Sequence, residues 1–128
     1  MDNETFEQLV NEGIAAIPEP FRSKIENVAF IIEDRPSRRQ RREMHLDHDH
    51  TLLGLYEGIP QTQRGEHYFA VLPDKITIFK EPILELSADH DEIRKIVAET
   101  VWHEIGHHFG LTEAQVRRRE RERRANGE

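Results

Sequence analysis

The chain has 128 residues and a formal net charge of −7, from 25 acidic and 18 basic side chains, and 36% of its residues are hydrophobic. It contains no cysteine, which excludes disulfides, thiolate zinc sites and cysteine nucleophiles. The acidic N-terminus does not resemble a signal peptide and no apolar run approaches the roughly 18 residues of a membrane helix, so we expect a cytoplasmic protein without a membrane partner.

The beginning of the chain predicts a helix and then a buried strand. Apolar residues recur with helical spacing over 3–17, where Asn3 or Thr5 is placed to cap the helix. A short second helical segment is expected over 19–27. The run VAFIIED (28–34) is rich in β-branched and aromatic residues and predicts a buried strand.

A polar segment from Arg35 to His50 follows this strand. It has almost no apolar residues, and a basic block precedes three histidines, so we expect a flexible, exposed loop over 35–50. His45, His48 and His50, with the aspartates between them, could hold an accessory metal. Because ordering a flexible loop costs conformational entropy, we favour a loop with only weak, adventitious metal affinity.

Three more strands are expected in the middle of the chain. LLGLYEGI (52–59) and HYFAVL (67–72) are separated by a polar turn, and KITIFKEPI (75–83) follows them. Pro82 lies inside the third run. Because proline cannot donate to a strand ladder, it indicates an edge strand or a strand end at that point.

The longest helical pattern lies between Asp89 and Gly110. Asp89 with Glu92 three residues later fits a capping box, and Gly110 lies where a left-handed C-cap is expected. An apolar stripe along this segment predicts that one face of the helix packs in the core.

Thr112 and Gln115 form a second capping box that starts a last helix, charged nearly all round. Its end, 118–128, is expected to be a charged tail. The order of helix, strands and helices implies a single α+β domain over 1–128. We expect a small sheet, mostly antiparallel or mixed, with the long helix packed on one face.

The sequence VWHEIGHHFGLTE (101–113) contains a candidate catalytic metal site. His103 and His107 are four residues apart on the predicted helix, so their Cβ atoms lie about 6 Å apart on one face. Two imidazoles so placed can reach one ion at about 2.0 to 2.1 Å. Glu104 is turned about 100° from His103, which suits a general base acting on water at the ion. The motif arises by chance in many proteins, but here it ends a core helix that strands precede.

The third ligand is less well defined by the sequence. A chain reversal at Gly110 would bring Glu113, six residues after His107, back beneath the ion. A carboxylate at the start of a helix is also favoured by the helix dipole, by about 0.3 to 1 kcal/mol, so Glu113 can be explained without a metal. His108 is a weaker candidate, because it points away from the face that His103 and His107 share.

HEIGHHFGL, preceded by LLGLYEGIP and DKITIFKEPILEL, resembles the small bacterial zincin-like metallopeptidases called minimal zincins, whose motif is HExxHxxGxxD. The resemblance covers about 27–117. It implies one catalytic zinc ion held by His103, His107 and the acidic residue Glu113, with Glu104 as the catalytic glutamate. Glu113 departs from the aspartate that the family usually has at this position, and its extra methylene lengthens the reach of the carboxylate.

These features together predict a zinc-dependent metallopeptidase that hydrolyses peptide bonds in a peptide or protein substrate. Zinc would activate a water molecule, and Glu104 would act as the general base. An extended substrate would pair with an edge strand, either LLGLYEG or ITIFKEP. Tyr56, Tyr68 and His108 are candidate oxyanion donors.

Two other classes of function are compatible with parts of the sequence. A domain this small has little room for a cleft, so it could be a zincin-like module that binds zinc and a peptide or protein partner without turnover. Arginine clusters at 38–42 and 117–124 could contact phosphates. We expect no nucleic-acid partner, because the chain is net acidic and glutamates interrupt the second cluster.

Overall fold

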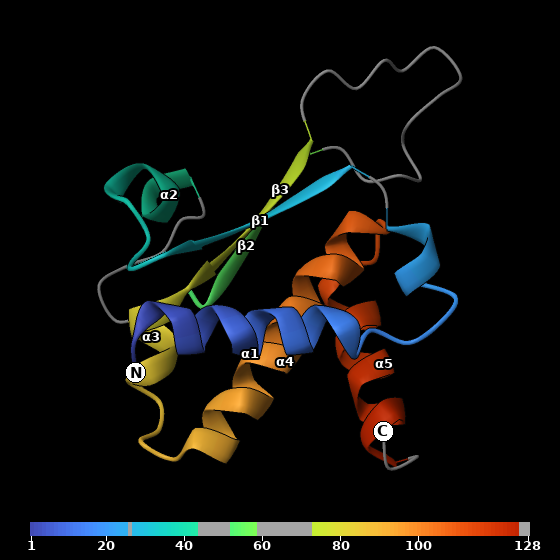
Figure 1. Cartoon of the computed structure of the whole chain (residues 1–128). Helices are drawn as coiled ribbons and strands as arrows, with labels where there is room; N and C mark the ends of the chain where they lie inside the picture. Colours follow the sequence, from blue (N-terminus) through green and yellow to red (C-terminus); the bar gives the residue numbers. More distant parts are fainter. Residues whose placement is uncertain (26, 44–51, 59–72, 126–128) are drawn as a thin grey trace.

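The computed structural model describes residues 1–25, 27–43, 52–58 and 73–125. Within these ranges the chain has an α+β fold, in which a small mixed sheet packs against a long helix and the first helix crosses that helix (Figure 1). The elements, in chain order, are α1 (Asn3–Ala15), η1 (Arg22–Lys24), β1 (Val28–Glu33), α2 (Arg38–Glu43), β2 (Gly54–Glu57), β3 (Asp74–Phe79), α3 (Lys80–Leu84), α4 (His90–His108) and α5 (Glu113–Ala125).

The central strand of the sheet is β3. The described strands have the order β1-β3-β2, with β1 parallel and β2 antiparallel to β3. Ile76, Ile78 and Phe79 of β3 are fully buried, because both neighbouring strands and α4 cover them. This mixed sheet with the long helix on it confirms the predicted fold class.

The interpretation of KITIFKEPI as an edge strand is wrong. Strand β3 pairs on both sides and ends at Phe79, and Pro82 lies buried in the short helix α3 that follows. Pro82 is the third residue of α3, where a helix has no intrahelical acceptor for the backbone N–H, so proline is tolerated there. The second alternative given for Pro82, a strand end at that point, agrees with the end of β3 at Phe79.

The flexible loop expected over 35–50 is also partly wrong, because helix α2 forms at Arg38–Glu43. A capping box starts it: Ser37 N donates to Gln40 Oε1 at 2.7 Å, and Gln40 N donates to Ser37 Oγ at 3.0 Å. Gln40 is buried, so one face of this arginine-rich helix is packed. The three histidines considered for an accessory metal lie in residues 44–50, which are outside the described residues. The strand expected at 67–72 is outside them as well.

Helix α1 begins as predicted but is capped one residue earlier than expected. The Asp2 carboxylate accepts from Thr5 N at 2.8 Å, in place of a cap by Asn3 or Thr5. The short segment expected over 19–27 forms the single turn η1. No helix in the described ranges is both long enough and apolar enough to cross a membrane.

Helix α1 packs against α4 through apolar side chains and a close helix crossing. Phe6, Leu9 and Val10 are buried in the same cluster as Val97 of α4. A Cβ added at Gly13 would lie 3.2 Å from the Cα of Ala98, so the two backbones approach closely at that point. Figure 1 shows α1 lying across α4.

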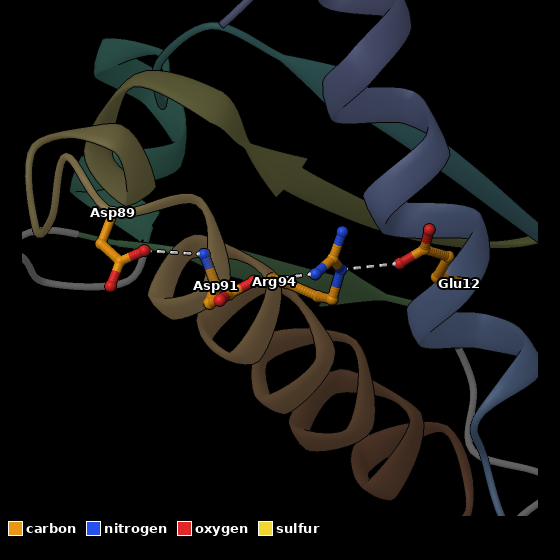
Figure 2. A network of polar contacts seen from close by, with 4 residues as sticks. All are labelled: Glu12, Asp89, Asp91 and Arg94. Carbon is orange, nitrogen blue, oxygen red and sulfur yellow. Dashed lines mark hydrogen bonds and ion pairs between the residues drawn. The ribbon is translucent and has the colours of Figure 1, made fainter.

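A polar network joins the same two helices at the surface (Figure 2). Arg94 of α4 contacts Glu12 of α1 and Asp91 of its own helix, both at 3.1 Å. The Asp91 backbone N in turn donates to the N-cap carboxylate of Asp89 at 3.0 Å. About half of the Arg94 and Glu12 side chains is exposed, so solvent screens this pair.

We therefore expect apolar burial to hold α1 on α4. Phe6→Ala should lower the free energy of unfolding by about 3 to 5 kcal/mol, because it leaves a cavity at a fully buried position. Arg94→Met should lower it by less than about 1 kcal/mol, and this loss should shrink as salt is added. Urea unfolding at low and high salt measures both values, and an Arg94→Met loss as large as that of Phe6→Ala would contradict this account.

Candidate metal centre

The candidate site lies on α4, which is a core helix, as predicted. Its N-cap is Asp89, whose carboxylate accepts from Asp91 N, and it runs for 19 residues to His108. The predicted reciprocal contact from Glu92 is not made, since the Glu92 carboxylate accepts from Ser87 Oγ. Val101 and Ile105 are fully buried, so the motif lies within the packed part of the helix.

The structure brings the two candidate ligand imidazoles together. The ring centroids of His103 and His107 are 5.2 Å apart and the rings are inclined at 70°. Both side chains are partly exposed, whereas Glu104 between them is 8% exposed. Two neighbouring imidazole donors open to solvent fit two of the three protein ligands that zinc takes in catalytic sites, and the adjacent Glu104 carboxylate is not counted among them.

A tight turn ends α4 at Gly110. Gly110 has a φ of 79° and its N donates to His107 O at 2.9 Å, while Leu111 N donates to Gly106 O at 3.0 Å. This pair of bonds is a Schellman motif, which requires the left-handed conformation that glycine adopts without strain. The predicted left-handed C-cap is therefore confirmed.

The next helix begins immediately after this turn. Thr112 N donates to Gln115 Oε1 at 2.8 Å and Gln115 N donates to Thr112 Oγ1 at 3.2 Å, which confirms the second capping box. Helix α5 therefore starts at Glu113. The structure does not describe the side chain of Glu113. Among the described side chains, no group of three or more histidine, aspartate or glutamate residues is close enough to hold an ion.

A close contact holds α5 against the end of α4. Val116 of α5 is fully buried, and a Cβ added at Gly106 would lie 2.6 Å from Val116 Cγ2. Only a glycine at 106 allows the two helices to approach this closely. The contact therefore determines how far the start of α5 lies from the two histidines.

Strand β2 lies directly over the middle of α4. A Cβ added at Gly54 would lie 2.7 Å from Thr100 Cγ2 and 3.2 Å from Glu104 Cγ. The stem of Glu104 is therefore packed against the backbone of the strand, which restricts the rotamers of this side chain.

His108 and Tyr56, two of the candidate oxyanion donors, both contact the buried carboxylate of Asp74. His108 is fully buried, and its Nδ1 lies 2.8 Å from Asp74 Oδ2. The Tyr56 hydroxyl donates its single proton to the same oxygen at 2.8 Å. These contacts occupy His108 Nδ1 and the Tyr56 hydroxyl, and the full burial of His108 distinguishes it from the partly exposed imidazoles of His103 and His107. Tyr68 lies outside the described residues.

Asp74 is the residue that the sequence analysis missed. It is 2% exposed and it is the first residue of β3, whereas the expected strand began one residue later, at Lys75. The available signal was an acidic residue at the start of a strongly apolar strand, together with a third histidine, His108, directly after the motif.

A mixed sheet over a helix that carries HExxH, followed by a glycine turn and a further helix, is the arrangement of a zincin-like domain. The chain belongs to the zincin-like metallopeptidase family, whose model matches residues 25–123. A solved structure of a conserved hypothetical protein from Thermus thermophilus is similar to it, with 25% identity, a TM-score of 0.57, and coverage of 85% of this chain and 94% of that chain. No curated protein matches it significantly.

The contact between α4 and α5 generates a prediction about packing beside the site. Gly106→Ala should lower the free energy of unfolding by about 1 to 3 kcal/mol, because its methyl group overlaps Val116. Val116→Ala should also destabilise, through the cavity it leaves. In the double variant the small residue makes room for the methyl group, so the combined loss should fall below the sum of the two by at least about 0.5 kcal/mol. Denaturant unfolding of all four proteins measures this coupling, and strictly additive losses would contradict the contact.

Proposed function

We propose that the protein is a zinc-dependent metallopeptidase that hydrolyses peptide bonds in peptide or protein substrates. His103, His107 and Glu113 would hold one zinc ion, and Glu104 would act as the general base. The observation that carries the proposal is the pair of solvent-accessible imidazoles, 5.2 Å apart, on a core helix with a nearly buried glutamate between them. Membership of the zincin-like metallopeptidase family supports it.

When bound, zinc would polarise the substrate carbonyl and lower the pKa of its water ligand toward about 7. Glu104 would accept the proton of the attacking water and deliver it to the leaving amine. The packing of its stem against Gly54 supports this role, because a base with restricted rotamers needs less reorganisation during proton transfer. The low exposure of Glu104 limits competition from bulk water for its carboxylate.

An extended substrate would pair with strand β2. Of the two candidate edges, ITIFKEP is excluded because β3 is central. Among the described strands, β2 pairs with β3 alone, and it lies against the helix that carries the site. Backbone pairing with this edge would place a peptide carbonyl near α4 with little dependence on the substrate side chains.

The turn after α4 supports Glu113 as the third ligand. The Schellman motif and the capping box place residue 113 at the first position of α5, directly after the chain reverses. The Gly106–Val116 contact holds that end of α5 close to α4. A glutamate reaches one methylene further than the aspartate that the minimal zincin motif has at this position.

Substitution of the proposed base tests turnover. Glu104→Gln should bind zinc as the wild type does and cleave peptides about 10² to 10⁴ times more slowly, because the amide cannot accept the proton. Glu7→Gln, at an exposed position of α1, is the matched control and should retain full activity. Zinc content and cleavage of unfolded proteins and peptide libraries are measured together. A wild type that binds zinc but cleaves nothing would favour the alternative, a zincin-like module that binds partners without turnover.

Substitution of Glu113 separates its two possible roles. If it is a ligand, Glu113→Ala should weaken zinc binding by a large factor, and Glu113→Asp should retain most of the affinity because the carboxylate remains. If it only complements the helix dipole, Glu113→Ala should change the stability by about 0.3 to 1 kcal/mol and leave zinc affinity unchanged. Competition with a chromophoric chelator measures the affinity, and unchanged binding removes Glu113 from the ligand set.

A further inference from the structure

A polar network that is buried at Asp74 and His108 and partly buried at Tyr56 adjoins the helix of the candidate site and takes no part in the proposed reaction. It consists of Tyr56 on β2, Asp74 on β3 and His108 at the end of α4. Asp74 Oδ2 accepts from the Tyr56 hydroxyl at 2.8 Å and lies 2.8 Å from His108 Nδ1. Because a carboxylate oxygen only accepts, we assign the donor proton to Nδ1. Thus β2, β3 and α4 meet at one oxygen atom.

The carboxylate of Asp74 is confined from its other side as well. Gly58 follows β2 with a φ of 152°, and a Cβ added there would lie 2.5 Å from Asp74 Oδ1. The main chain therefore closes over the second oxygen. A carboxylate buried to this degree is tolerated only where hydrogen-bond donors meet it, so its partners are held in a defined geometry.

The face of β2 that is turned toward α4 contacts residues that lie along one side of that helix. Gly54 packs on Glu104, and Tyr56, two residues later on the same face, packs its ring edge-on to His108 with centroids 6.0 Å apart. Glu104 and His108 are four residues apart and share a face of the helix. The spacing of two residues on the strand thus corresponds to one turn of the helix.

His103 and His107 each precede one of these sheet-facing residues by one position. They are therefore turned about 100° from the line that contacts β2, and both are partly exposed. A rotation of α4 about its axis would move both imidazoles together. Close-packed apolar contacts limit such a rotation, and a hydrogen bond to a fixed carboxylate limits it further, by distance and angle.

We propose that Asp74 is a positioning residue for the candidate metal site. Through its hydrogen bond to His108 it sets the rotation of the last turns of α4, and so aims His103 and His107 at the same ion. Tyr56 holds the Asp74 carboxylate in the orientation that His108 requires. The zinc-dependent part of this proposal rests on the function proposed above, but the positioning of the two imidazoles can be measured without metal.

Zinc affinity, measured by chelator competition, is the first test. Asp74→Ala should lower it by roughly tenfold, the lower end of what loss of an outer partner of a metal site costs. Asp74→Asn should restore most of the affinity, because the amide oxygen still accepts from Tyr56 and His108. Val97→Ala is the matched control: it truncates a fully buried residue of α4 that makes no part of the network. It should lower stability without changing zinc affinity.

The second test uses the metal-free protein. The imidazole resonances of His103 and His107 should shift in Asp74→Ala and stay in place in Asp74→Asn and Val97→Ala. A third readout is the visible spectrum of the cobalt-substituted protein, which should change in Asp74→Ala and stay unchanged in Asp74→Asn and Val97→Ala. Tyr56→Phe removes one bond to Asp74 and no bulk, so it serves if Asp74→Ala fails to fold, with a smaller loss expected in the same direction.

The outcomes separate the two proposals. If the wild type binds no zinc, the proposed function is wrong. The imidazole resonances of His103 and His107 in the metal-free variants then test the positioning proposal alone. The positioning proposal is overturned if Tyr56→Phe and a folded Asp74→Ala leave those resonances at their wild-type positions. It is also overturned if Val97→Ala, at matched loss of stability, lowers zinc affinity as much as Asp74→Ala does.

Discussion

The structure depends on one constraint: helix α4 must fill the core and present polar chemistry at the same time. Its apolar face, with Val97, Val101 and Ile105, packs beneath the sheet and against α1. A helix has a single rotation about its axis, so the setting that buries these residues also decides where every histidine on it points. Close backbone approaches at glycines and one buried carboxylate define that setting more sharply than apolar contact alone.

The elements and turns that local sequence signals describe could be predicted. The start of α4 at Asp89, its end at Gly110 and the capping box at Thr112 are all confirmed, because each rests on bonds between residues two to five apart. The pairing of His103 and His107 followed from helical geometry in the same way. Helix α2 was missed although it has such a signal, the box of Ser37 and Gln40, because the arginines around it indicated a loop.

The contacts that arrange these elements in space could not be predicted. Asp74 and His108 are separated by 34 positions, and nothing in either local sequence shows that they meet. The central position of β3 depends on pairing with two distant strands, which periodicity within the strand does not reveal. The close approach of Gly54 to Glu104 has the same origin, since a glycine in a strand signals a near neighbour without naming it.

The HExxH pattern leaves two positions open, because the chemistry places no demand on them. In this protein neither is open: Ile105 is fully buried and Gly106 has no room for a methyl group beside Val116. A library that randomised these two positions would therefore be selected for packing and stability as well as for activity. In this domain the two unspecified positions of the motif, Ile105 and Gly106, determine how α4 packs in the core and against α5. The three specified positions carry the side chains of the candidate site.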